Sequence, residues 1–221
     1  TPAEQIDLLE FTRGDGSPLI TDETIQSGRY DSVEITIESD ESSSLSFIQD
    51  GSNEFALFIP DDQQAKLELP ADFEVEDGET TALTLQLELR ESLRERDDGV
   101  FELHPSVRLV QDDEVGTVRG TIATALVPEG CAAAVYAYKG SNIIPGDIDD
   151  TGGPISTAAV FGNRSDGLSY SVDFLEAGPY TLAFTCDADE EDPARSDDLE
   201  FVTEDDATVE AGETETLNIA R

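Results

Sequence analysis

Lysine, histidine, methionine and tryptophan are scarce or absent in this chain of 221 residues. Lysine occurs only as Lys66 and Lys139, histidine only as His104, and there is no methionine or tryptophan. A single histidine excludes a metal centre built from several histidines, and any Ser-His-Asp triad would have to use His104. His104 precedes Pro105 in an alternating segment, so it is expected on the exposed side of a strand. The chain also lacks a nucleophile elbow and a phosphate-binding loop, so we predict no enzymatic activity.

Long apolar runs and basic residues are also in short supply. No segment approaches the roughly 20 apolar residues of a membrane helix, so we predict no membrane-spanning segment. The chain has 12 Lys and Arg against 51 Asp and Glu, which gives a net charge of −39. Both halves of the chain are acidic. Such a surface repels nucleic acid and anionic lipid, so neither is expected as a partner.

Two hypotheses account for the acidity, and both can hold together. In the first, the protein lives in high salt, where screening over about 3 Å at 1 M makes carboxylate repulsion tolerable; the shortage of lysine favours this halophilic explanation. In the second, some carboxylates bind Ca²⁺, which prefers oxygen ligands. Residues 147–152 (DIDDTG) begin like a calcium loop, but Ala158 stands where an EF-hand needs glutamate. The acidic residues 187–192 could converge with this loop, and the candidate calcium ligands are Asp147, Asp149, Asp150, Asp187 and Asp189.

The chain has two cysteines, Cys131 and Cys186. Each lies at the end of an expected strand, in the segments CAAAVYAY and YTLAFTC. A disulfide between them would imply an oxidising compartment and would stabilise the fold by about 4 kcal/mol. Two separate buried thiols are the alternative.

A sequence motif with a Gly-Glu-Thr turn occurs twice. Residues 75–83 (VEDGETTAL) return as residues 209–217 (VEAGETETL), and a Gly-x-Tyr segment precedes each copy, at residues 28–30 and 178–180. The glycines are expected to supply a turn conformation that a side chain resists. The pattern predicts two β-modules with similar closing halves, and independent use of a common turn is the alternative.

Short alternating segments separated by turn residues run through both halves, and only residues 90–96 resemble a helical turn. The strands expected in the first half are 32–38, 45–48, 55–59, 66–69 ending at Pro70, 83–89 after the glycine turn, and 101–110 with a bulge or edge at Pro105. Those expected in the second half are 116–122, 132–138, 155–161, 168–174, 180–186, 199–202 and 214–219. Residues 111–114 form a polar hinge. We therefore predict an all-β chain of two consecutive β-sandwich domains, residues 1–114 and 115–221.

Three motifs follow one another in the chain: LELPADFEVEDGETTALTLQLELRESL, FELHPSVRLV and GTVRGTI. Together they resemble the family known as domain of unknown function 4382, found in secreted bacterial and archaeal proteins, many of them lipoproteins. The family's aromatic-x-Leu-x-Pro-x-hydrophobic-Arg-Leu pattern is matched by Phe101, Leu103, Pro105, Val107, Arg108 and Leu109. The second half, with FLEAGPYTLAFTC and VEAGETETLNIA, is similar to transthyretin-like or carboxypeptidase-regulatory-like sandwiches of Ig-like Greek-key topology.

This resemblance implies an extracellular or outer cell-surface location and brings no catalytic residues. The family usually opens with a Leu-Thr-Asp-Ala-Pro type segment that this chain does not show. We therefore expect the natural protein to carry a further N-terminal part with a lipidated cysteine. The first sandwich would then lack its N-terminal strands and leave an open edge for strand addition.

The expected function is a non-enzymatic structural, adhesion or assembly module that acts through sheet edges and loops. Its partner would be another protein or a second copy of the chain. The alternative is a carbohydrate-binding module with a glycan as ligand. Such modules usually bind on aromatic platforms, and the absence of tryptophan counts against this alternative.

Overall fold

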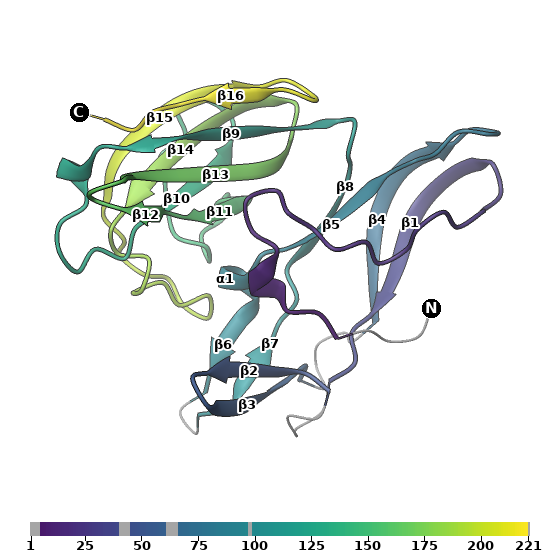
Figure 1. Cartoon of the computed structure of the whole chain (residues 1–221), viewed down its shortest axis with the longest axis horizontal. Coiled ribbons are helices and arrows are strands. Elements are labelled where there is room, and N and C mark those ends of the chain that lie inside the picture. The colour runs from purple at the N-terminus through teal and green to yellow at the C-terminus, as the bar shows by residue number, and fades with distance from the viewer. Residues whose placement is uncertain (1–4, 40–44, 61–65, 97–98, 221) are drawn as a thin grey trace. The chain divides into compact units, whose positions relative to one another are not determined.

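The computed structural model describes residues 5–39, 45–60, 66–96 and 99–220. The chain divides into two compact units, Thr1–Gln111 and Asp112–Arg221. Both units are all-β, as predicted, with only short helical turns between strands (Figure 1). The division lies inside the polar segment 111–114. No helix of the described residues is long and apolar enough to cross a membrane.

The first unit is built from three small sheets. Their strand orders are β1-β4, β2-β3-β7-β6 and β5-β8. The elements are η1 (Leu8–Glu10), β1 (Gly28–Thr36), β2 (Phe47–Asp50), β3 (Asn53–Phe58), β4 (Lys66–Val75), β5 (Leu83–Leu87), α1 (Leu89–Ser92), β6 (Leu93–Glu95), β7 (Phe101–Leu103) and β8 (Val107–Gln111). The predicted hairpin at residues 45–59 is confirmed, since β2 and β3 pair up to Asp50 opposite Asn53.

Three local predictions for this unit were wrong. Strand β4 continues through Pro70 to Val75, because two residues of β4 stand against one residue of β1 directly after the proline. This bulge accommodates a residue that cannot donate to the ladder. The expected helical segment 90–96 is helical only to Ser92 and then extends as β6. The expected strand 101–110 is interrupted around Pro105, so that β7 pairs with β3 and β6 whereas β8 pairs with β5.

The second unit is a sandwich of two four-stranded sheets (Figure 1). Their strand orders are β11-β10-β14-β15 and β12-β13-β9-β16. The elements are β9 (Val115–Ile122), η2 (Thr124–Leu126), β10 (Ala134–Lys139), β11 (Ser156–Ala159), β12 (Phe161–Asn163), β13 (Gly167–Glu176), β14 (Gly178–Thr185), β15 (Phe201–Val209) and β16 (Thr214–Thr216). The expected strand 155–161 changes sheets at Val160. Strand β15 begins within the expected strand 199–202 and continues beyond it to Val209, through the acidic residues 204–206.

The main core of the second unit lies between the two sheets. It includes Val118 of β9, Tyr170 of β13, Val135 of β10 and Phe184 of β14, each at most 1% exposed. A smaller second core lies on the other face of β10, where Tyr136 and Tyr138 pack with Ala183, with Phe201 at the start of β15 and with partly buried loop residues such as Ile148. Strand β10 is therefore buried on both faces, which explains its uninterrupted apolar sequence.

The sequence repeat corresponds to a repeated local structure. In each unit the Gly-x-Tyr strand pairs antiparallel with the strand that leads into the Gly-Glu-Thr turn, so that Gly28 lies opposite Val75 and Gly178 opposite Val209. The turn glycines, Gly78 and Gly212, have φ of 83° and 73°, as predicted. Each tyrosine hydroxyl donates to the carbonyl four residues earlier: from Tyr30 to Gln26 over 2.7 Å, and from Tyr180 to Glu176 over 2.9 Å. The two units thus share one strand-and-corner arrangement, which is similar to the tyrosine corner of other sandwiches.

Candidate functional site

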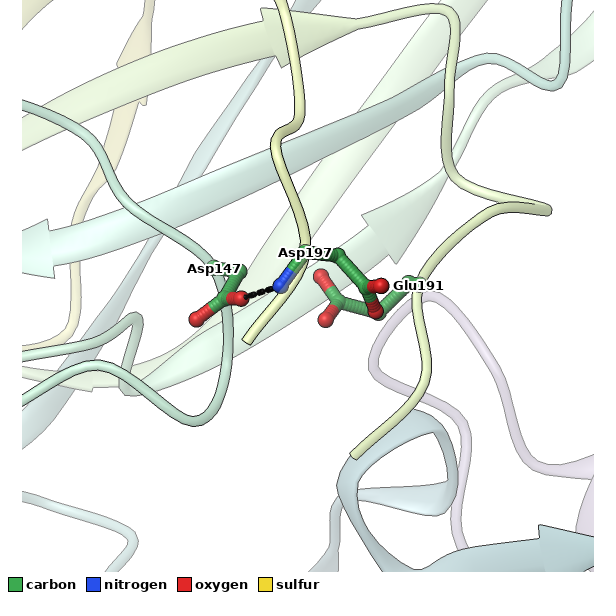
Figure 2. Close-up of side chains that lie close together, drawn as sticks. All are labelled: Asp147, Glu191 and Asp197. Carbon is green, nitrogen blue, oxygen red and sulfur yellow. Dashed lines mark hydrogen bonds between the residues drawn. The ribbon is translucent and has the colours of Figure 1, made fainter. Parts of the chain in front are cut away.

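Two loops of the second unit meet over the outer face of the sheet β11-β10-β14-β15. One runs between β10 and β11, the other between β14 and β15, and both contribute to the second core through Ile143, Ile148 and Leu199. Three carboxylates come together there: Asp147 from the first loop, and Glu191 and Asp197 from the second (Figure 2). One oxygen of each lies within 4.8 Å of the other two. We call these three residues the acidic cluster.

Hydrogen bonds from backbone and side chains hold the acidic cluster in place. The buried Asp147 accepts from the amide of Asp150 at 3.0 Å and from the amide of Asp197 (Figure 2). Glu191 accepts from the hydroxyl of Tyr136 at 3.0 Å and from an amide of the first loop. Asp197 accepts from the Arg195 side chain at 2.9 Å. The cluster therefore ties the two loops to each other and to strand β10.

Bringing three carboxylates together has an electrostatic cost. Burial raises the pKa of Glu191 above its usual value, and the charges of Asp147 and Asp197 add to the increase. The hydrogen bonds from Tyr136 and Ile148 act in the opposite direction. Burial together with the neighbouring Tyr136 also raises the pKa of Tyr138, whose hydroxyl donates to the carbonyl of Gly146. This face of the sheet therefore favours protonated groups, because repulsion and desolvation both disfavour charge.

The acidic cluster has the ligand chemistry of a hard divalent cation, since it offers carboxylate oxygens from two loops. Each of its six carboxylate oxygens, however, already accepts a hydrogen bond from the protein. The Arg195 side chain also forms an ion pair with Asp197 at 2.9 Å. These hydrogen bonds can hold the two loops together without a bound cation.

The structure brings together only one of the five calcium candidates with other acidic side chains at metal-binding distance. Asp147 belongs to the acidic cluster, whereas Asp149 and Asp189 are exposed outside it. Asp150 contributes its backbone amide. Asp187 accepts from the amide of Glu200 at 3.1 Å and closes the base of the second loop. The two loops do converge, as expected, but through Glu191 and Asp197; Asp197 carries no sequence signal beyond its acidity, since only the path of the loop places it there.

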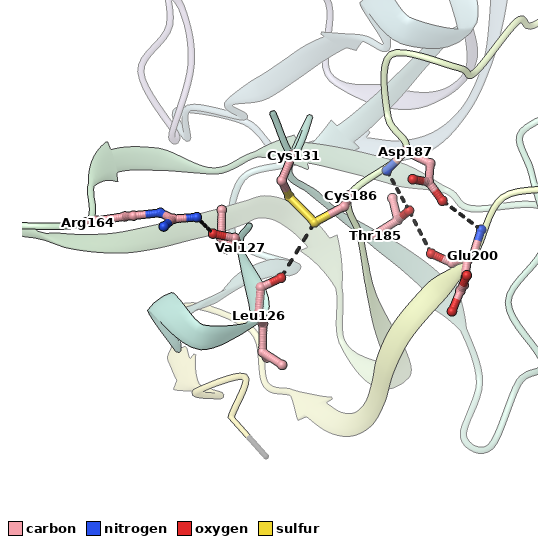
Figure 3. Close-up of a disulfide and its surroundings, with 8 residues drawn as sticks. All are labelled: Leu126, Val127, Cys131, Arg164, Thr185, Cys186, Asp187 and Glu200. Atoms are coloured by element: carbon pink, nitrogen blue, oxygen red, sulfur yellow. Dashed lines mark hydrogen bonds between the residues drawn. A yellow bond between two sulfur atoms is a disulfide. The ribbon is translucent and has the colours of Figure 1, made fainter. Parts of the chain in front are cut away.

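The predicted disulfide between Cys131 and Cys186 is present (Figure 3). It lies at the start of the second loop, next to the buried hydroxyl of Thr185, whose hydrogen bonds close the base of this loop. The hydroxyl of Thr185 donates to the carbonyl of Glu200 at 2.9 Å and accepts from the amide of Asp187 at 3.0 Å. The covalent bond and these hydrogen bonds together fix both ends of the loop that carries Glu191 and Asp197.

His104 occupies a more enclosed place than expected. Its side chain is 14% exposed, and its Nε2 lies 3.0 Å from a carboxylate oxygen of Glu102. The expectation of a surface strand position was wrong, because β7 ends at Leu103 and the His104 side chain that follows is largely enclosed. The hydroxyl of the neighbouring Ser106 donates to Glu91 at 2.7 Å. This serine is thus bonded to a carboxylate and not to the imidazole.

The tyrosines, which a carbohydrate-binding module would need at its surface, lie mostly in the core. Tyr136, Tyr138, Tyr170 and Tyr180 are at most 1% exposed. The exposed large hydrophobic side chains of the described residues are all leucines and isoleucines. Among the described residues, no aromatic side chain is fully exposed.

Comparison with known proteins tests the family resemblance and supports it for the first half of the chain. No curated protein matches the chain. A family model does match, and it covers residues 1–105, which is nearly the whole of the first unit. The family resemblance inferred from the motifs is thus confirmed for this part of the chain: residues 1–105 match the family described as Domain of unknown function (DUF4382).

Proposed function

We propose that this chain is a non-enzymatic structural module of an extracellular or cell-surface protein and that it assembles with a second copy of itself by strand addition. The observation that carries the proposal is the two-stranded sheet of the first unit. Strands β1 and β4 have nine and ten residues and, among the described residues, form their ladder only with each other. A two-stranded sheet is marginally stable by itself, and each outer edge presents unpaired N–H and C=O groups.

The edge of β1 is the better template of the two. Strand β4 is interrupted by Pro70 and the bulge that follows it, and both features discourage pairing. Strand β1 contains no proline. Its half-buried side chains include Tyr30, which stacks on Phe73 with ring centroids 5.3 Å apart. An added strand would therefore extend a sheet in which β1 and β4 already pack together through Tyr30 and Phe73.

Two further observations support the extracellular, high-salt environment that we propose. The disulfide is typical of an oxidising compartment. The net charge of −39 suits a high-salt medium, where self-repulsion between copies is screened. Attachment through a lipidated N-terminal part stays a prediction.

The test measures association and backbone protection together, in molar NaCl. Sedimentation over a range of protein concentrations should show dimers, and hydrogen exchange at β1 amides should slow as concentration rises. The amides of β10, a central strand, serve as the internal control because they are paired on both sides. A protein that stays monomeric, with β1 exchange independent of concentration, would refute the proposal.

Two proline variants locate the contact. Neighbouring residues of an antiparallel strand point their N–H groups to opposite sides. Of E34P and I35P, one therefore removes a bond to β4 and the other removes an outward N–H. We expect the variant that loses only the N–H pointing away from β4 to fold and to lose dimerisation. If both variants fold and both dimerise as the wild type does, the interface lies elsewhere.

A further inference from the structure

The hairpin between β12 and β13 carries a three-residue signal that no feature discussed so far explains. Its residues are Asn163, Arg164 and Ser165. Asparagine followed two positions later by serine or threonine, with any residue but proline between, is the acceptor signal for N-linked glycosylation. The other asparagines, Asn53, Asn142 and Asn218, have Phe55, Ile144 and Ala220 at the second following position. The signal therefore occurs once in the chain.

The fold places this signal where a transferase can reach it. Asn163 is the last residue of the edge strand β12 and lies opposite Gly167 at the tip of the hairpin. Residues 162–167 are all exposed. The Arg164 guanidinium donates to the carbonyl of Val127 and anchors the hairpin to the body of the unit (Figure 3).

The backbone around Asn163 forms a turn closed by the asparagine side chain. Its Oδ1 accepts from the amide of Ser165 at 2.8 Å and from the amide of Asp166 at 3.0 Å. Asparagine side chains stabilise turns in this way, which holds the amide at the outside of the chain. The Nδ2 donates to the carboxylate of Asp166 at 2.6 Å. A glycan would replace one of the two Nδ2 hydrogens, and the other can keep this bond.

We propose that Asn163 is an N-glycosylation site of the folded protein. The co-reactant is a sugar activated as a polyprenyl phosphate or diphosphate. Nδ2 of Asn163 forms a bond to C1 of this sugar, and the C1–O bond to phosphate breaks. The lipid phosphate leaves with the electron pair of that bond, and the amide proton passes to a base of the transferase. The inference rests on the proposed extracellular location, because only there does the chain meet such a transferase.

A glycan at this position also has a structural consequence. Asn163 ends the edge strand of the sheet β12-β13-β9-β16. A bulky hydrophilic group there would shield the edge from pairing with another chain. It would leave the edge of β1 in the first unit as the site of the proposed assembly.

The first experiment incubates the folded protein with a transferase specific for the Asn-X-Ser/Thr signal and its lipid-linked oligosaccharide, followed by peptide mass spectrometry. We expect the peptide with Asn163 to gain the mass of one glycan. N163Q and S165A should lose this gain, and S165T should keep it. Asn53, exposed at the tip of another hairpin but without the hydroxyl, is the internal control and should stay unmodified.

The second experiment measures the same peptide from the natural protein. A glycan on Asn163 there supports the inference and the extracellular location together. If the transferase modifies the unfolded chain but not the folded protein, the hairpin does not present the site and the inference is overturned. If the folded protein is modified in vitro but Asn163 carries no glycan in the natural protein, the inference is overturned because the natural protein does not meet such a transferase. Association through β1 is measured on unglycosylated protein, so the test of the proposed function does not depend on the result of either glycosylation experiment.

Discussion

Removal of the Cys131–Cys186 disulfide should destabilise the second unit and leave the first unit unchanged. The bond joins residues 55 positions apart. In the chain-entropy model, loss of a loop of this size costs about 4 kcal/mol at 25 °C. A unit of about 110 residues unfolds with an entropy of roughly 230 cal/mol/K, so the Tm of the second unit should fall by about 15–20 °C. Both cysteines are only partly buried, so the variant C131A/C186A loses little packing.

Tyrosine signals make this measurement specific for the second unit. Four of the five tyrosines lie there in the core, and the chain has no tryptophan. Near-ultraviolet circular dichroism during thermal unfolding in molar NaCl therefore follows mainly this unit. Wild-type protein treated with a thiol reductant is the control and should melt at the same temperature as C131A/C186A. A decrease in Tm of less than about 5 °C in both samples would refute the loop-entropy reasoning.

Three further predictions concern packing, pH and salt. Alanine at Gly120 would place its Cβ 1.8 Å from the carbonyl oxygen of Leu217, so G120A should lower the unfolding free energy by about 3 kcal/mol in a urea titration. G16A, with nothing within 4 Å, should leave it unchanged, and a wild-type value for G120A would contradict the β9–β16 packing. Because folding raises the pKa of Glu191, protonation favours the native state, so stability should rise as the pH falls through this raised pKa toward the ordinary pKa of glutamate. E191Q should lose this rise in Tm, and an unchanged pH profile would count against the buried environment of Glu191. Under the salt hypothesis, molar NaCl should raise the Tm, and millimolar CaCl₂ should add nothing beyond NaCl of equal ionic strength. A rise with calcium alone that D147N removes would favour the metal hypothesis instead.

Local sequence features predicted the secondary structure best where one physical factor dominated. The strands of the second unit follow from alternating apolar residues, and the positive φ of Gly78 and Gly212 follows from a turn that disfavours a side chain. The prediction failed where a neighbouring strand changed the outcome. Strand β4 continues past Pro70 because a bulge against β1 accommodates the missing donor, and this depends on the partner strand.

The acidic cluster shows the same limit for side chains that are distant in the sequence. The motif at residues 147–152 drew attention to Asp147, which lies in the acidic cluster, and the run of acidic residues at 187–192 drew attention to the second loop. The sequence could not select Glu191 and Asp197 among the neighbouring carboxylates, because all of them have the same chemistry and similar local surroundings. The selection depends on the packing of the loops against Tyr136 and Tyr138.

The sequence alone determined the all-β class, the acidic composition and the repeated turn, whereas it left separate thiols open as the alternative to the disulfide that the structure shows. These properties depend on composition and on patterns within about ten residues, where backbone preference and alternation decide the structure. Tertiary structure alone decided that β10 is buried on both faces, that β1 pairs only with β4 among the described residues, and that three carboxylates meet over one sheet. These features depend on contacts between segments far apart in the chain, and the free energy of such contacts is set by the packing of the whole unit.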